Sequence, residues 1–460
     1  MSRTKTFRVL AAGVLLGLMA IPVRSETLTD ALIDAYRNSN LLEQNEALLR
    51  ATDENVAIAM AGLRPTIAFS TLSQYSYAQS AITGQRIATE GLDTTFALTA
   101  QMVLFDFGRT QFAVEAAKET VLATRQSLLS IEQQVLLAAV SAFVDVRLQE
   151  AIVELRQNNV RVIGEQLRAA QDRFEVGEVT RTDVAQAESS LAQAQSGLVA
   201  AQGDLSIARE NYKAAVGHYP GVLTAPPAPP PAAATLDQAK SVARREHPLV
   251  RQSQHQVAAS ELNVQRAKSQ MKPSFNGTAQ LSTDQDGFQQ NGVGLGFSQT
   301  LYAGGSLAAT LRQAMANRDA NRSNLLQTGV VVEQNVGTVW SNLEVADATV
   351  QSTIEQINAA QVAFEGVKEE ASLGARTTLD VLNAEQDLLD ARNLRLQAEA
   401  SRYTGVYQLL SAMGLLTVEH LGLGIPTYDP AAYYNAVRKG PAHSAQGKKL
   451  ERIMKSIGKN

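Results

Sequence analysis

Residues 27–65 read TLTDALIDAYRNSNLLEQNEALLRATDENVAIAMAGLRP, and residues 235–273 repeat this pattern as TLDQAKSVARREHPLVRQSQHQVAASELNVQRAKSQMKP. The two stretches align without a gap and keep Thr, Leu, Ala, Arg, Gln, Asn-Val and the final proline in register. Further along the chain the offset changes once, and from there Gly177 matches Gly374. A repeat of this length predicts a chain built from two copies of one structural unit.

The repeat divides the chain into segments. We expect the first unit to cover residues 26–224 and the second to cover residues 235–416. Residues 225–234, which include APPAPPP, predict an extended proline-rich linker between them. We expect residues 417–460 to form a strap along the molecule that ends in a basic tail.

Residues 1–25 have the pattern of a secretory signal peptide, with basic residues, an apolar run and small residues before an expected cut ahead of Glu26. No later stretch has about 18 consecutive apolar residues, so we expect no helix in the inner membrane. The chain has no Cys, which excludes disulfides, thiolate nucleophiles and thiolate metal sites. Its 41 basic and 45 acidic residues nearly balance, and this gives no indication of a nucleic-acid partner.

Two very long helices are predicted, one in each unit. Residues 109–174 contain no proline and are rich in Ala, Leu, Gln, Glu and Arg, and at 1.5 Å per residue they would extend roughly 98 Å. Residues 306–373 match them, and shorter helices are expected at residues 180–216 and 379–413. Helices of this length need a partner along their length, so we expect coiled coils.

Short segments that alternate with period two interrupt the helical pattern. They are residues 66–77, 94–105, 274–282 and 293–302. One side of each is apolar and the other is small or polar, as is typical of strands in a transmembrane β-barrel. A soluble hairpin packed on a helix is the alternative. Four strands cannot close a barrel in lipid, so the membrane interpretation requires several chains to share one barrel.

The paired segments together resemble the TolC family of outer-membrane efflux proteins over residues 27–414. The resemblance rests on the two helical repeats, on LFDFGR and LYAGG where strands return to helices, and on the matched turns VGEVTRTDV and LGARTTLDV. It implies a mainly α protein with a small β part: a homotrimer with a twelve-stranded barrel in outer-membrane lipid and a long antiparallel coiled-coil α-helical barrel in the periplasm.

Residues 154–189 are similar to the subgroup that serves type I protein secretion. This resemblance implies a periplasmic adaptor and an inner-membrane ABC transporter as partners. Two other functions remain open. The same duct could serve a drug or metal efflux pump, or the chain could be a periplasmic coiled-coil scaffold without a pore.

The two helix-to-helix turns are the candidate site. Gly177 and Gly374 each end a helix, where a left-handed residue is favoured. With Val179 and Ala375 they are the expected tip turns and adaptor contacts. Thr180 and Thr377 predict helix caps, with Asp183 and Asp380 three residues later.

The family resemblance adds a gate to these caps. It implies that Arg376 reaches Thr182 and Asp183 as a latch between neighbouring coiled coils. It also implies that Asp380 and Asn383 form a ring at the pore mouth. Ala371 stands where a latch Tyr is often found and Asn383 where a second ring Asp is expected, so the latch should be weaker and the mouth less negative.

No enzymatic chemistry is expected. The five His residues are scattered without metal-ligand spacing, and no glycine-rich phosphate loop follows a strand. We therefore expect no catalytic residues, no metal and no cofactor, and an energy source that resides in a partner.

Overall fold

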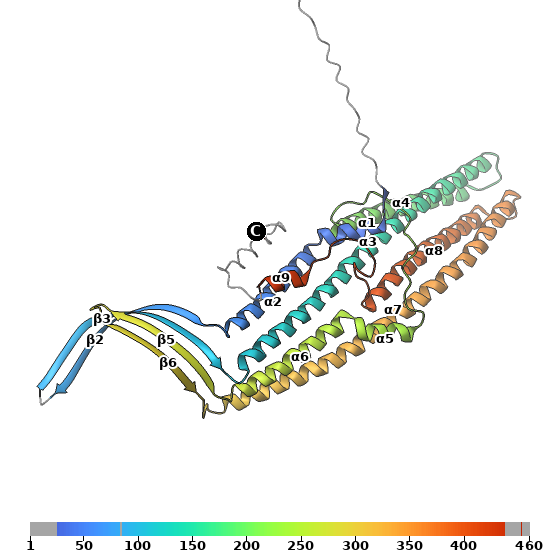
Figure 1. Ribbon diagram of the computed structural model, residues 1–460. Coiled ribbons are helices and arrows are strands. Elements are labelled where there is room, and N and C mark those ends of the chain that lie inside the picture. The colour runs from blue at the N-terminus through green and yellow to red at the C-terminus, as the bar shows by residue number, and fades with distance from the viewer. Residues whose placement is uncertain (1–24, 83–84, 438–451, 453–460) are drawn as a thin grey trace, which may run out of the picture.

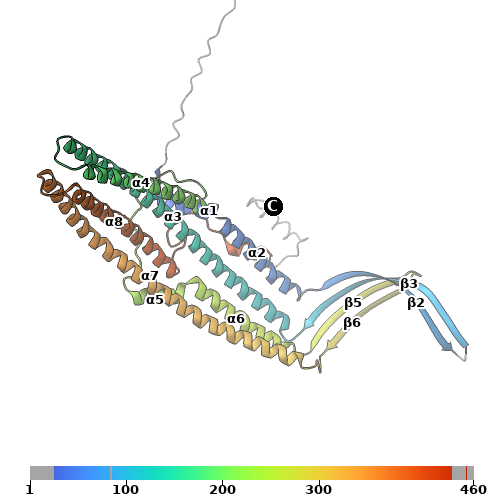
Figure 2. The ribbon, with the colours of Figure 1, turned by 180° about the vertical axis from the view of Figure 1, so that it is seen from behind.

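The computed structural model describes residues 25–82, 85–437 and 452 of the chain. The expected signal peptide, apart from Ser25, and nearly all of the basic tail lie outside these residues. The described chain is elongated, with a β-sheet at one end and the turns between long helices at the other (Figure 1). Figure 2 shows the same arrangement from behind.

Each unit contributes two short helices, two strands and two long helices. The first unit has α1 (Leu28–Asn38), α2 (Asn40–Ala61), β2 (Thr66–Ile82), β3 (Gln85–Phe105), α3 (Arg109–Glu175) and α4 (Arg181–Val216). The second has α5 (Leu236–Glu246), α6 (Pro248–Ser269), β5 (Ser274–Asp284), β6 (Gln289–Ser298), α7 (Ser306–Ser372) and α8 (Thr378–Ala412). The remaining elements are β1 (Ser25–Glu26), β4 (Val222–Leu223) and α9 (Pro430–Val437).

The four long strands form one antiparallel sheet in the order β2-β3-β5-β6. Large apolar side chains are widely exposed on it; Val293 is 90% and Leu295 84% exposed in the single chain. Among the described residues, β2 and β6 each have a neighbouring strand on one side only. The sheet therefore ends in two edges with free backbone groups.

The predicted strand bounds need correction. β2 and β3 extend beyond residues 77 and 94 because their backbones stay paired, out to Ile82 opposite Gln85, where the apolar alternation has ended. The fourth strand, β6, covers Gln289–Ser298 and so lies earlier in the sequence than the predicted residues 293–302. β6 ends at Ser298, opposite Ser274, because Pro273 precedes β5 and has no N–H to extend the ladder.

The long helices pair as antiparallel coiled coils, α3 with α4 and α7 with α8 (Figure 1). The largest core cluster lies at mid-length, where Phe143 and Leu136 of α3, Tyr212 of α4 and Leu410 of α8 are fully buried. An 18-residue stretch of α3 is apolar enough to resemble a membrane-spanning helix, but 56% of it is buried within the protein. Packing against neighbouring helices therefore explains why this stretch is apolar.

Two glycines hold the repeated units at equivalent joints. Gly217 follows α4 with φ 102° and lies against Asn38 at the junction of α1 and α2. Gly414 follows α8 with φ 81° and lies against His247 at the junction of α5 and α6. A Cβ on Gly414 would lie 2.6 Å from the Cα of His247, so the close approach requires glycine.

Helix α9 lies on α2. Tyr433 donates to Glu54 at 2.8 Å, and Arg125 of α3 donates to the carbonyl of Pro430 at 3.2 Å. Asp53 is fully buried beneath this segment, and burial raises the pKa of its carboxyl to about 6. These contacts fix residues 430–437 along the outside of the α2–α3 pair.

Candidate functional site

The two tip turns have the same backbone geometry. Gly177 has φ 81°, its N–H donates to Phe174 at 3.0 Å, and the N–H of Glu178 donates to Arg173 at 2.9 Å. In the second turn Gly374 has φ 78°, its N–H donates to Ala371 at 3.2 Å, and the N–H of Ala375 donates to Glu370 at 2.9 Å. In each turn these two bonds form a Schellman motif at the end of the long helix.

Each turn leads directly into a capped helix. Thr180 donates through its N–H at 2.8 Å and its hydroxyl at 2.7 Å to the carboxylate of Asp183. Thr377 makes the equivalent bonds to Asp380 at 3.0 and 2.8 Å. Both carboxylates therefore belong to capping boxes.

The capping hydrogen bonds lower the pKa values of both carboxyl groups. Hydrogen bonds from the side chain and backbone of Thr180 lower the pKa of Asp183, and bonds from the backbone and side chain of Thr377 lower the pKa of Asp380. A lowered folded-state pKa means that each carboxylate stabilises the fold above its ordinary pKa. This contribution is lost as the pH falls through the lowered value.

Arg376 lies at the apex beside these caps but does not reach the first turn of the same chain. Its Nε donates to Glu370 at 2.8 Å, and this bond is the main cause of its raised pKa. Within the described tip, no hydrogen bond or ion pair joins Arg376 to Thr182 or Asp183. The guanidinium is half exposed.

A different arginine joins the two coiled coils within one chain. Arg173, in the last turn of α3, donates to the backbone carbonyl of Ala371 at 3.1 Å, near the end of α7. A cation here also faces the negative end of the α7 dipole. Sequence reasoning missed Arg173; its only sequence signal is a basic residue in the last turn, which is common in helices.

Exposed apolar side chains also mark the apex. Val176 is 71% and Leu373 78% exposed, and each directly precedes the glycine that ends its helix. Val179 lies between α3 and α4, partly exposed, and Ala375 is exposed. Large apolar residues at matched exposed positions are typical of a contact surface. Val179 and Ala375 were predicted from the sequence as contact residues, whereas Val176 and Leu373 were not.

A buried polar pair lies further from the apex. Glu385 of α8 and Asn159 of α3 are 5% and 4% exposed. Burial raises the pKa of Glu385, while its hydrogen bond with Asn159 opposes the rise. Asn383, the expected ring residue, is exposed and lines a cavity of about 650 Å³ between α3, α4 and α8. The pair therefore connects the two coiled coils beside that cavity.

Nothing in the described part of the chain forms a group of three or more His, Asp or Glu residues that could hold a metal ion. The polar groups of the tip are instead committed to helix caps and to contacts between helices. Such an arrangement can hold the two coiled coils in a defined relative position.

Comparisons with known proteins agree with this architecture. Residues 32–218 and 240–415 match the family model described as outer membrane efflux protein. The outer membrane efflux protein BepC of Brucella suis is 36% identical over 94% of both chains. TolC of Escherichia coli is 23% identical over 89% of this chain and 87% of its own. The alkaline protease secretion protein AprF of Pseudomonas aeruginosa is 24% identical over 89% of each chain.

Solved structures share the fold. The outer membrane protein VceC of Vibrio cholerae superposes with a TM-score of 0.75 at 18% identity, over 84% of this chain and 96% of its own. The expected fold class, mainly α with a small β part in two repeats, is thus confirmed.

Proposed function

Because the chain belongs to the outer membrane efflux protein family, we propose that three copies form the exit duct of a type I protein secretion system. The family places the protein in the outer membrane as an efflux or secretion channel, and its relatives are channel proteins. The protein cargo and the trimer are parts of our proposal.

The open sheet is the observation that carries the proposal of a shared barrel. Two free edges and exposed apolar side chains are incompatible with a single chain in lipid, where backbone groups must be paired. Pairing β6 of one copy with β2 of the next satisfies both edges. Three copies of four strands then give a closed barrel of a size found in outer membranes.

The partners act at the other end. We assign the energy for transport to an inner-membrane ABC transporter, which the duct contacts through a periplasmic adaptor. The adaptor would contact the exposed turns around Gly177, Val179, Gly374 and Ala375. The exposed Val176 and Leu373 support this assignment, because apolar side chains gain most from being covered.

The gate would lie at the same turns. We assign Arg376 of one coiled coil as the latch to Thr182 and Asp183 of its neighbour, and Asp380 with Asn383 as the pore-mouth ring. The half-exposed guanidinium of Arg376 supports this, since its Glu370 bond uses only Nε and leaves other donors available.

A drug or metal efflux pump is the second candidate. The name of BepC, an efflux protein at 36% identity, favours it, whereas the name of AprF favours protein secretion. The helical tube is compatible with both.

Deleting the gene separates these functions. We expect the culture medium to lose one or more secreted proteins, with resistance to detergents and antibiotics unchanged. Protein content of the medium is compared by mass spectrometry, and resistance by inhibitory concentration. An unchanged set of secreted proteins together with new drug sensitivity would assign the duct to an efflux pump instead.

A further inference from the structure

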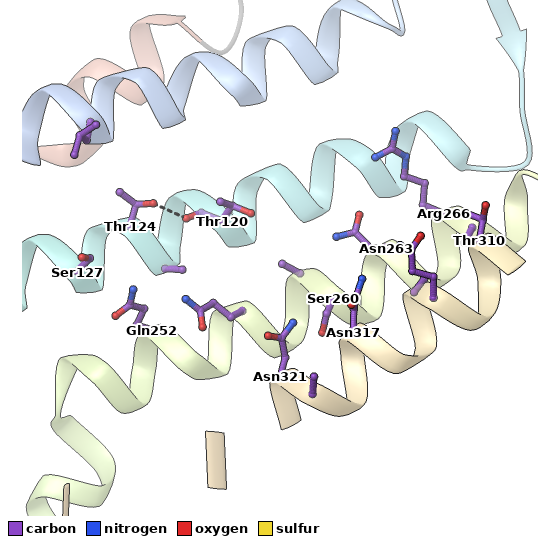
Figure 3. A pocket seen from close by; sticks show the side chains of 18 of the residues that line it. Thr120, Thr124, Ser127, Gln252, Ser260, Asn263, Arg266, Thr310, Asn317 and Asn321 are labelled. Carbon is purple, nitrogen blue, oxygen red and sulfur yellow. Dashed lines mark hydrogen bonds between the residues drawn. The ribbon is translucent and has the colours of Figure 1, made fainter. Parts of the chain in front are cut away.

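A groove of about 810 Å³ runs along the helices next to the sheet (Figure 3). Four helices line it: α2, α3, α6 and α7. Its wall is dominated by amide and hydroxyl side chains, and Arg266 is the one charged residue among those that line it. Its apolar members are Leu48 and a few alanines.

The hydroxyls of the groove are used within the helices. Thr120, Thr124 and Ser260 donate to backbone carbonyls of their own helices at 3.0, 2.9 and 2.7 Å. The amides differ, since most of them have no hydrogen bond to any other residue in the described chain. These are Gln252, Gln256, Asn263, Gln270, Gln313, Asn317 and Asn321. The groove thus presents a row of donors and acceptors that have no partner among the residues the structure describes.

The groove and α9 lie on different faces of α2 and α3. On α3, Arg125 faces α9, whereas Thr120, Thr124 and Ser127 face the groove. Four neighbouring helices share the hollowed surface (Figure 3). In the proposed tube the hollowed face would be the inner one, because α9 covers a different face of α2 and α3.

We propose that this groove binds an extended segment of polypeptide during its passage. The inference rests on the proposed duct for protein export. Each peptide unit offers one N–H and one C=O, and an Asn or Gln amide offers the same pair, so the groove matches a backbone whatever its sequence. An apolar compound would need an apolar lining, and a highly charged one would need more than Arg266.

The groove also has the length for such a segment. From Gln252 to Gln270 the wall of α6 extends roughly 27 Å, at 1.5 Å per residue. An extended chain covers that distance with about eight residues. Amide hydrogen bonds exchanged with water are individually weak, so the segment is held briefly and then released.

The test uses purified trimers in planar bilayers and a neutral synthetic peptide of Gly, Ser and Asn, added on the extracellular side. From that side the peptide reaches the groove through the barrel without crossing the tip. We expect brief current blocks, shortened about tenfold by Asn263→Leu with Asn317→Leu, because the two substitutions remove hydrogen-bonding amides. Asn263→Gln with Asn317→Gln should keep the block times close to those of the original protein, because Gln retains the amide.

Two controls separate binding in the groove from general effects. Poly(ethylene glycol) of similar length should show block times that the Leu variants shorten much less, since its ether oxygens accept hydrogen bonds but its chain has no N–H to donate. Asn358→Leu, an exposed amide of α7 outside the groove, should behave like the original protein. Block times unchanged in the Asn263 and Asn317 double variant would overturn the inference, whereas the export function is tested separately by the gene deletion.

Discussion

Replacing Gly414 with alanine is expected to destabilise the protein by on the order of 3 kcal/mol or more. The residue has φ 81°, and an added Cβ would lie 2.6 Å from the Cα of His247 and 3.0 Å from Pro248. Backbone at a helix junction cannot move aside as a side chain can. The end of α8 would therefore separate from the α5–α6 joint. Thermal unfolding and the amount of trimer in outer-membrane fractions measure the loss.

Alanine substitutions at two other glycines serve as comparisons for this loss of stability. Gly217→Ala should cost somewhat less, because of its three nearest atoms only the Cβ of Asn38, at 2.8 Å, is fixed by the backbone, whereas the amide atoms of that side chain can rotate away. Gly164→Ala, inside α3 with open space around it, should leave stability unchanged or slightly improved. If Gly414→Ala unfolds at the same temperature as Gly164→Ala, the close packing at the second joint has no energetic importance.

Replacing Arg376 with alanine is expected to raise the resting conductance of trimers in planar bilayers several-fold. The substitution removes the proposed latch from all three tips at once, and small effects at equivalent positions multiply in the closed-to-open equilibrium. Arg376→Lys keeps the charge but loses the planar donor group, so it should give an intermediate conductance. Glu370→Gln frees Arg376 from its pair within the turn and should leave the closed level unchanged or lower.

Arg173→Ala tests the contact between the two coiled coils of one chain, for comparison with Arg376→Ala. It removes the bond to the carbonyl of Ala371 between α3 and α7 without touching Arg376. A closed level unchanged by Arg376→Ala would remove that residue from the gate. A rise with Arg173→Ala alone would move the latch to the contact inside each subunit.

The helical part of the fold could be predicted because its signals are local. Gly374 adopts a left-handed conformation three residues before Thr377, which with Asp380 caps the next helix, so neighbouring residues alone mark this helix break. Strand ends were less predictable because they depend on a partner. β6 ends at Ser298 since Pro273, distant in the sequence, precedes the strand it pairs with.

The tip contacts were beyond sequence reasoning for the same reason. Arg173 is recognisable only once the end of α7 lies beside it, and Glu385 matches the exposed Glu188 of the first repeat although it is buried against Asn159. The repeat aligns these two residues but does not determine their surroundings. Packing of α8 against α3 made them different.

Disulfide trapping can show whether β6 of one copy pairs with β2 of the next in a single barrel. The chain has no Cys, so introduced pairs report only on their own contact. Ser70→Cys in β2 is combined in turn with Gly292→Cys, Gly294→Cys or Gly296→Cys in β6, because neighbouring strands place opposed residues within disulfide reach. We predict that at least one pair, oxidised in the outer membrane, yields a covalent trimer on non-reducing gels. Monomers alone from all three pairs, in a protein that still reaches the outer membrane, would contradict the shared barrel.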